Sequence, residues 1–174
     1  MPLSLYYKYI SEKPTMVDWY DVSSFGNLSH DFITKYQDYV IWEELTKYQD
    51  LKPQTLHEFA DRFNWNLLVH YQKIPEQLII LHEGKISIRA WCKYIPRFQT
   101  LSDQFILKYK DSLDMCMVYK YQKLSEQTID YLLQTGHNMK WNIISQYQPL
   151  TPTMICKYKK HIHFFDLCLN KNVS

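Results

Sequence analysis

Tryptophan recurs at a nearly fixed interval along this chain. The five tryptophans are 23, 23, 26 and 50 residues apart, and Met115 divides the last interval into 24 and 26. A recurrence of this length is typical of repeat proteins, in which each copy is one small supersecondary unit. We therefore expect a series of similar units rather than a fold held by one long-range topology. The tryptophans are Trp19, Trp42, Trp65, Trp91 and Trp141.

Each tryptophan opens a short motif with an aliphatic residue at +3, tyrosine at +6 and glutamine at +7. This spacing is expected to place the tryptophan, the aliphatic residue and the tyrosine on one face of a short helix. The copy at Trp91 is one residue longer, contains Pro96 and ends in Phe98-Gln99, and an early copy of Trp19, Val22 and Phe25 ends in Gly26. The regular copies are 42–49, 65–72, 115–122 (with Met115 in place of tryptophan) and 141–148.

A second motif begins the other helix of each unit, which comes first in the unit. It starts with Leu or Ile, and Ser29, Ser102, Ser125 and Thr151 follow that residue where a helix N-cap is expected. Pro53 and Pro152 occupy the first turn, where a missing N–H costs little. Asn64 and Asp114 are expected caps of the tryptophan helices, and Gly84 and Gly136 are expected left-handed C-caps in the two longest units. The six copies are 28–33, 51–56, 74–79, 101–106, 124–129 and 150–155.

These patterns predict an all-α fold, a solenoid-like stack of short helix-turn-helix tandem repeats. Only three glycines are present, which disfavours β-sandwiches and dinucleotide-binding folds. Helices this short are stabilised by stacking on their neighbours. We expect one repeat domain over 1–174, with a degenerate N-terminal cap at 1–27, repeats at 28–50, 51–73, 74–100, 101–123 and 124–149, and a C-terminal cap at 150–174.

The recurring aromatic and glutamine positions each allow two interpretations. The tryptophan, aliphatic and tyrosine positions are expected to form the core, and the alternative is a ligand-binding aromatic ladder. The core interpretation places the rings of Tyr36, Tyr48, Tyr109, Tyr121 and Tyr158 inside, with the adjacent lysines in solvent. The glutamine after the tyrosine is expected to satisfy backbone groups where the helix ends, and the alternative is that it reads nucleotide bases.

The repeat unit Leu-Ser-x-x-Phe-Ile followed by Asp/Asn-Trp-x-x-Ile/Leu-Ser-x-Tyr-Gln resembles a short tandem repeat of large cytoplasmic DNA viruses, the Marseillevirus relatives among them. The resemblance covers residues 18–158 and is strongest at 101–106, 124–129 and 142–150. It implies a viral, non-enzymatic repeat protein located in the host cytoplasm or the virion, and it carries over no functional residues.

Signatures of catalysis and of cofactor binding are missing from the sequence. It has no G-x-S-x-G, P-loop, G-x-G-x-x-G or H-E-x-x-H motif. We therefore expect neither an enzyme nor a cofactor. Cys156, His161, His163 and Cys168 are zinc-type ligands whose spacing matches no common finger, so unrelated cap residues are expected and a metal site is the alternative. All four cysteines are expected to be free thiols.

The charge of the chain is uneven and bears on its partners. Residues 1–87 carry 8 Lys/Arg and 12 Asp/Glu, net −4, and residues 88–174 carry 12 and 6, net +6. The leading hypothesis is a protein-interaction scaffold that uses variable positions such as Asp31, Gln54, Glu76, Asp103 and Glu126. The alternative is nucleic-acid binding by the basic half, with candidate contacts Lys140, Lys157, Lys159 and Lys160.

A third hypothesis is a structural virion role with self-association through the two ends of the stack. The sequence has no apolar run long enough for a bilayer and no signal-peptide pattern, so we expect neither membrane insertion nor secretion.

Overall fold

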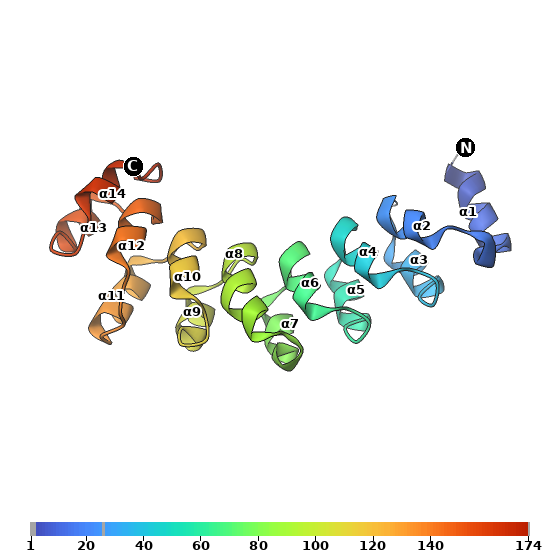
Figure 1. The fold of residues 1–174 in the computed structure, drawn as a ribbon, viewed down its shortest axis with the longest axis horizontal. Coiled ribbons are helices and arrows are strands. Elements are labelled where there is room, and N and C mark those ends of the chain that lie inside the picture. The colour runs from blue at the N-terminus through green and yellow to red at the C-terminus, as the bar shows by residue number, and fades with distance from the viewer. Residues whose placement is uncertain (1–2, 26, 174) are drawn as a thin grey trace. The chain divides into compact units, whose positions relative to one another are not determined.

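The computed structural model describes residues 3–25 and 27–173, and every regular element in them is helical (Figure 1). The all-α prediction is confirmed. Contacts divide the chain into two compact units, Met1–His82 and Glu83–Ser174, called units 1 and 2. Gly26, at which the sequence places the end of the early copy, lies outside the described residues.

Unit 1 consists of short helices that follow one another as pairs. They are α1 (Leu3–Glu12), the 3₁₀ turn η1 (Pro14–Met16), α2 (Trp19–Phe25), α3 (His30–Lys35), α4 (Trp42–Tyr48), α5 (Pro53–Glu58), α6 (Trp65–Tyr71) and α7 (Glu76–Leu81). We call α3, α5 and α7 A helices, and α2, α4 and α6, which begin with tryptophan, B helices. B helices pack on B helices, α2 on α4 and α4 on α6.

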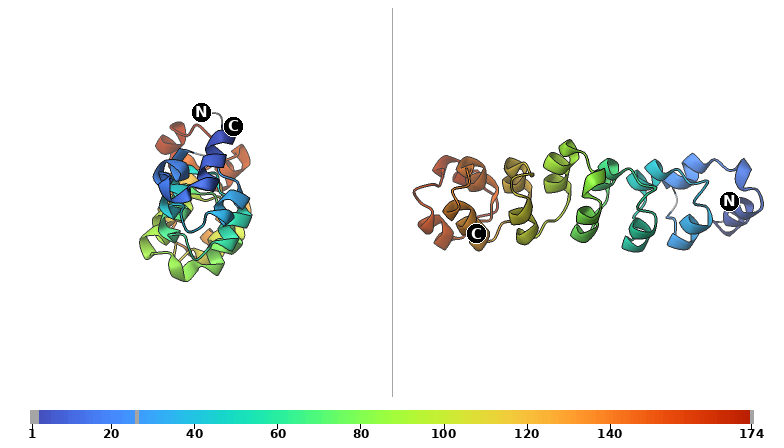
Figure 2. Two further views of the ribbon diagram at one scale, coloured as in Figure 1. Left: turned by 90° about the vertical axis from the view of Figure 1, so that its right-hand side faces the viewer. Right: turned by 90° about the horizontal axis from the view of Figure 1, so that it is seen from below.

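Unit 2 continues the same alternation. It contains η2 (Glu83–Lys85), the π-helix η3 (Ala90–Tyr94), α8 (Ile95–Phe98), α9 (Asp103–Tyr109), α10 (Met115–Tyr121), α11 (Glu126–Gln134), α12 (Trp141–Tyr147), α13 (Pro152–Lys157) and α14 (Phe164–Cys168). Its A helices are α9, α11 and α13, and its B helices are α8, α10, α12 and α14, again packed in sequence. Within each unit the pairs follow chain order (Figure 1; Figure 2, right).

The predicted N-caps are confirmed. Ser29, Ser102, Ser125 and Thr151 each accept a hydrogen bond from the backbone N–H three residues later. Pro53 and Pro152 are the first residues of α5 and α13. Asn64 and Asp114 cap α6 and α10 through the backbone N–H groups of Asn66 and Cys116. Local side-chain chemistry therefore begins these helices where the pattern predicts.

The two glycine predictions have different outcomes. Gly136 follows α11 with φ +70°, a left-handed conformation that glycine adopts without steric cost, as predicted. The prediction for Gly84 is wrong, because Gly84 lies inside the right-handed 3₁₀ turn η2. The Ile86 N–H donates to the Glu83 carbonyl at 3.1 Å, so this turn continues without a left-handed residue.

The extra residue in the Trp91 copy is absorbed by a π-helical turn. The Ile95 N–H donates to the Ala90 carbonyl, five residues back, at the end of η3. A π turn inserts one residue into a helix without ending it. As a result α8 still ends directly before Gln99, and Gln99 occupies the same C-cap position as the other glutamines.

The core lies between the A and B helices. It contains the residue that opens each A motif, the aliphatic residue at +3 of each B helix and, less expectedly, the residue at +4. Trp65 and Trp91 are buried, whereas Trp19, Trp42 and Trp141 are half-buried. The +3 positions are Leu45, Leu68, Val118 and Ile144, and the +4 positions are Thr46, Val69, Tyr119 and Ser145.

The tyrosine predictions are only partly correct. Tyr36 and Tyr158, on A helices or at their ends, are buried, and Tyr109 is half-buried. Tyr48 and Tyr121 are 61% and 40% exposed, so the prediction that their rings lie inside is wrong. Both sit at +6 of a B helix, which faces away from the core side occupied by +3 and +4.

Buried glutamines connect consecutive B helices, which confirms the expected backbone role. The side-chain Oε1 accepts the N–H of the residue that opens the preceding A motif, and Nε2 donates to a carbonyl of the preceding B helix. Gln49, Gln72, Gln122 and Gln148 bind the N–H of Leu28, Leu51, Leu101 and Leu124 at 2.9–3.3 Å, and the carbonyls of Ser23, Thr46, Pro96 and Tyr119 at 2.6–2.9 Å. These amides are therefore occupied, which leaves them unable to read bases.

Asn170 takes the glutamine's place after the last helix. Its Nδ2 donates to the carbonyls of Ser145 and Gln148 at 2.7 and 2.8 Å. A second helix, α14, follows α13 in this part of the chain, although it contains no tryptophan.

Tyr119 is an exception to the satisfied core. Its hydroxyl is buried and has no hydrogen-bond partner in the part of the chain that the structure describes. Burial raises the pKa of this hydroxyl, so the group is neutral at physiological pH. An unpaired buried hydroxyl costs about 1–3 kcal/mol.

We expect Tyr119→Phe to stabilise the chain by about 1 kcal/mol, because it removes this hydroxyl and keeps the ring. Urea denaturation of the variant and the parent measures the difference. Tyr121→Phe, on the exposed side of α10, is the control and should change nothing. A loss of stability in Tyr119→Phe alone would contradict the account.

Candidate functional site

Each B helix that the repeat pattern defines ends in an aromatic ring that reaches solvent. The ring precedes the glutamine, or in the first copy Gly26, and is exposed or half-buried. The glutamine that follows the ring in the later copies is buried, whereas the ring itself reaches solvent at the end of the helix. The rings are Phe25, Tyr48 and Tyr71 in unit 1, and Phe98, Tyr121 and Tyr147 in unit 2.

In unit 2 cations alternate with these rings. The Arg97 guanidinium lies 5.1 Å from the centre of the Phe98 ring and 5.4 Å from that of Tyr121. The Lys120 ammonium lies 5.5 Å from the centre of the Tyr121 ring and 5.1 Å from that of Tyr147. Each cation therefore connects the rings of two adjacent B helices. We call these five residues the basic–aromatic row.

The helix segments that carry the row contain basic but no acidic residues. The B-helix segments that carry it, 90–98, 115–121 and 141–147, contain no Asp or Glu. In unit 1, by contrast, α4 carries Glu43 and Glu44, and Glu44 pairs with Lys47 at 2.8 Å. That hydrogen bond raises the pKa of Lys47, and the charge of the ammonium is compensated. Unit 1 has exposed rings, whereas unit 2 has one exposed and two half-buried rings together with cations that have no acidic residue on the same helices.

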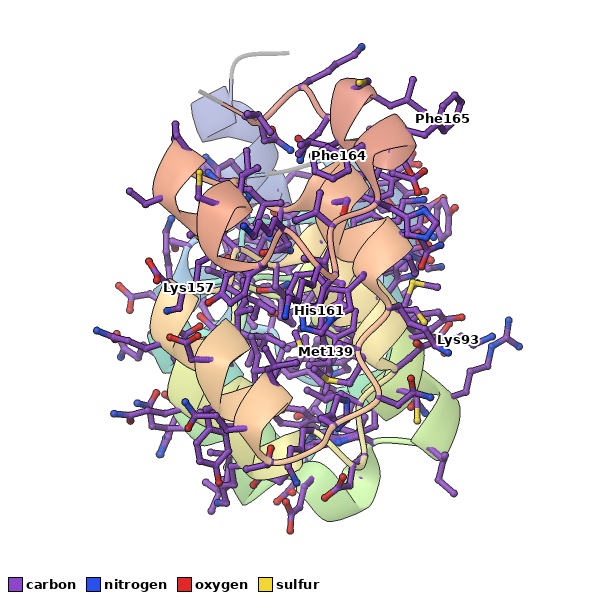
Figure 3. All side chains as sticks on the ribbon, turned by 90° about the vertical axis from the view of Figure 1, so that its left-hand side faces the viewer. Lys93, Met139, Lys157, His161, Phe164 and Phe165 are labelled. Carbon is purple, nitrogen blue, oxygen red and sulfur yellow. The ribbon has the colours of Figure 1, made fainter. Side chains whose placement is uncertain are left out.

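The lysines predicted from the sequence do not belong to this row. Lys140 precedes α12, and Lys159 and Lys160 lie in the turn after α13, all exposed. Lys157 forms ion pairs with Glu126 at 2.7 Å and Asp130 at 2.6 Å. In Figure 3 it lies on the opposite side of unit 2 from Lys93, which η3 carries. Hydrogen bonds to both carboxylates raise the pKa of Lys157, and these carboxylates compensate its charge.

Asp130 is the centre of this separate ion-pair cluster. Hydrogen bonds from Lys157 and from the Tyr158 hydroxyl lower the pKa of Asp130. Burial, and then the bond to Asp130, raises the pKa of Tyr158 to about 12. The cluster ties α13 to α11.

The lowered pKa of Asp130 predicts a loss of stability in acid. Its contribution is complete above the ordinary carboxyl pKa of 3.8 and declines as the pH falls below that value. Asp130→Asn should therefore destabilise the chain at pH 6, and the difference from the parent should shrink at pH 3. Urea denaturation at both pH values is the test, with Asp111→Asn, an exposed partner of Lys110, as control. A difference independent of pH would contradict the assignment.

The cysteine and histidine residues between positions 156 and 168 have other contacts or are exposed, and they do not form one cluster. His161 stacks on Trp141 with ring centres 5.0 Å apart, and His163 pairs with Asp166 at 3.2 Å. Cys156 and Cys168 are exposed free thiols. Among the described residues, no group of three or more His, Cys, Asp or Glu side chains is placed to hold a metal ion.

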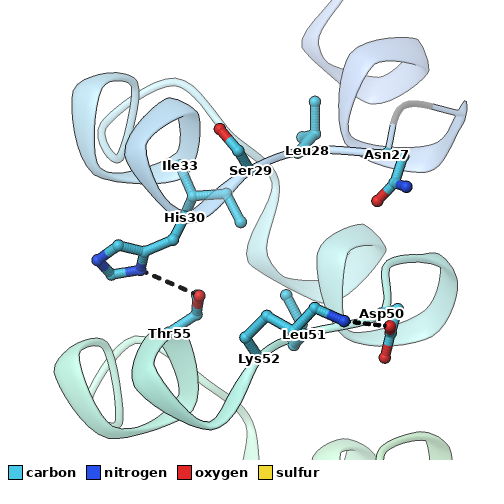
Figure 4. A pocket seen from close by; sticks show the side chains of 9 residues that line it. All are labelled: Asn27, Leu28, Ser29, His30, Ile33, Asp50, Leu51, Lys52 and Thr55. Atoms are coloured by element: carbon cyan, nitrogen blue, oxygen red, sulfur yellow. Dashed lines mark hydrogen bonds and ion pairs between the residues drawn. The ribbon is translucent and has the colours of Figure 1, made fainter.

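Two hollows lie away from the row. The one in unit 1 has a volume of about 340 Å³, and polar side chains that line it bind one another, Lys52 with Asp50 at 2.6 Å and His30 with Thr55 at 3.1 Å (Figure 4). The other, in unit 2, is an open depression of about 570 Å³ beside Trp91 and Tyr109.

The helices of residues 3–25 and 27–173 are each too short or too polar to cross a bilayer. Comparisons of the chain with protein-family models, curated proteins and solved structures found no match.

Proposed function

We propose that this chain is a non-enzymatic binding protein that holds its partner along the exposed ends of its B helices. The observation that carries the proposal is that an aromatic ring recurs at the same place in successive helix pairs and is exposed in four of the six, at Phe25, Tyr48, Tyr71 and Tyr121. Phe25 is 83% exposed, Tyr48 61% and Tyr71 49%. A large apolar side chain in solvent does not gain the free energy of burial. Aromatic residues are enriched where proteins contact their partners.

The A-helix positions suggested by the sequence are weaker candidates for the same role. Glu126 is paired with Lys157, and the Gln54 amide binds His30 at 3.0 Å. These side chains take part in contacts within the chain. Among the rings at the B-helix ends, by contrast, those of Phe25, Tyr48 and Tyr71 are about half exposed or more.

Site-specific photo-cross-linking tests the proposal. A benzophenone amino acid would replace Tyr48, Tyr71 or Tyr121 on the B helices, or Gln77 and Gln104 on the A helices, which are exposed controls. The chain is then irradiated in the cells that produce it. Adducts confined to the B-helix positions are the expected result. Equal adducts at all five positions, or none at the B-helix positions, would reject it. Nuclease and protease digestion of the adducts identifies the class of partner.

Self-association is a second candidate, favoured by α14. Phe164, Phe165 and Leu169 are 59%, 78% and 52% exposed in this terminal part of unit 2 (Figure 3 labels the two phenylalanines). A pair of Phe164→Ser and Phe165→Ser changes should convert any oligomer to monomer in a sedimentation measurement. A parent chain that is monomeric at high concentration excludes this candidate.

The resemblance to tandem-repeat proteins of large DNA viruses extends the proposal to a viral scaffold in the host cytoplasm or the virion. The test is the recovery of the chain from purified particles or infected-cell extract.

A further inference from the structure

Building on the proposed function, we propose that the basic–aromatic row of unit 2 binds a single-stranded nucleic acid. The row consists of Arg97, Phe98, Lys120, Tyr121 and Tyr147. Its rings and cations alternate across three consecutive B helices, α8, α10 and α12.

The charge of the row selects an anionic partner. Arg97 and Lys120 are exposed, and Lys123 lies exposed one residue beyond Gln122. The supporting helix segments have no acidic residue, so the two cations are held by ring faces rather than by carboxylates. A cation at a ring face keeps its charge and can turn to a phosphate, because cation–π attraction at exposed sites is weak, about 0.5–1 kcal/mol.

The rings select a partner with unpaired planar groups. Tyr121 is 40% exposed, and Phe98 and Tyr147 are half-buried at the corresponding positions of the neighbouring helices. Exposed aromatic rings beside basic residues are how proteins bind single strands, since each base offers a face for stacking and each phosphate a charge. Bases inside a duplex are already stacked. The row therefore favours single strands over duplexes.

Fluorescence anisotropy of a labelled oligo(dT), titrated with the full chain at several salt concentrations, tests the inference. An oligonucleotide of about 15 nucleotides covers the usual site size of single-strand binding domains. The duplex of the same length and poly-glutamate are compared as other anionic partners. We expect saturable binding to oligo(dT) that weakens with salt and exceeds binding to both.

Two matched pairs of variants separate the row from net charge and from exposed rings in general. Arg97→Gln with Lys120→Gln should weaken oligo(dT) binding at least about tenfold and reduce the salt slope by about 1.4, the value for two phosphate contacts. Lys159→Gln with Lys160→Gln removes the same charge elsewhere and should cost less than about threefold. Tyr121→Ala should weaken binding about tenfold, whereas Tyr48→Ala in unit 1 should leave it unchanged. Circular dichroism verifies that each variant is folded.

Three results would overturn the inference. They are no saturable binding in low salt, equal losses in the two lysine/arginine double variants, or poly-glutamate binding as tight as oligo(dT) with no effect of Tyr121→Ala. The last result would assign the row to an acidic protein segment. The photo-cross-linking result is independent of all three, so the binding function can stand when the nucleic-acid assignment fails.

Discussion

Replacing Gln148 by alanine is expected to destabilise unit 2 by at least about 3 kcal/mol. The side chain is 1% exposed and makes three hydrogen bonds. Its Oε1 accepts the Leu124 N–H at 2.9 Å, and its Nε2 donates to the carbonyls of Tyr119 and Gln122 at 2.6 and 2.7 Å. Truncation leaves these backbone groups buried without partners, and each unsatisfied group costs about 1–3 kcal/mol. Urea denaturation followed by circular dichroism measures the loss.

The control for this prediction is Gln146→Ala on the same helix. Gln146 is half-buried and its side chain makes no hydrogen bond among the described residues, so the cost should stay below about 0.5 kcal/mol. Gln148→Glu retains the acceptor for Leu124 but places a carboxylate against two carbonyls, and it should be at least as destabilising as alanine at neutral pH. Losses of equal size at Gln146 and Gln148 would show that the amide network does not hold neighbouring B helices together.

The glutamine network shows what a repeat makes predictable. A polar side chain that recurs beside a helix end is expected to bind backbone groups that also recur there. The carbonyls at the C-termini of short helices, which have no partner within the helix, are such groups. The residue's backbone role therefore follows from the sequence. The identity of the backbone partners does not follow, because they lie more than twenty residues earlier in the chain. Gln122, for example, binds the Pro96 carbonyl in the preceding B helix and the N–H of Leu101, which opens the next A motif. Only the stacking of the helices brings these groups together.

The tyrosine at +6 shows where one-dimensional periodicity misleads. Each residue turns the helix by about 100°, so +3 and +4 lie on either side of the tryptophan, at about 60° and 40° from it, while +6 lies about 120° away. Burial of Thr46 and Tyr119 at +4 places the core on that side. The sequence does indicate burial at +4, where the residues are small or apolar. That indication is weak, because Thr, Val, Tyr and Ser alternate there and share no obvious pattern. The hydrophobicity of tyrosine is not enough to establish burial.

The basic–aromatic row exists because the rings at +6 reach solvent, which the sequence pattern did not predict. Lysine and arginine beside an aromatic residue are visible in the sequence, yet the neighbours that matter are on different helices. Lys120 contacts the ring of Tyr147, 27 positions further along the chain. Lys157, by contrast, is surrounded by basic residues in sequence and by Glu126 and Asp130 in space. Local charge density therefore pointed to the compensated lysine rather than to the row.

Trp65→Ala is the second change with a large expected effect, a loss of about 3–5 kcal/mol from unit 1. Trp65 is 2% exposed, its Nε1–H donates to the Ala60 carbonyl at 2.9 Å, and its ring stacks on His82 with centres 4.3 Å apart. Alanine leaves a cavity and an unpaired carbonyl in the core of unit 1. The measurement is urea denaturation of the full chain, monitored by circular dichroism.

Tyr71→Ala on the same helix is the matched control. Its ring is 49% exposed at +6, so the variant should lose less than about 1 kcal/mol although it removes an aromatic side chain from the same motif. If Trp65→Ala and Tyr71→Ala were equally damaging, the exposed rings would belong to the core as the sequence first suggested, and the binding surface would lose its basis. A large difference between them would instead show that the ring at +6 contributes little to the stability of the fold. Its recurrence in successive helix pairs would then be explained by contact with a partner.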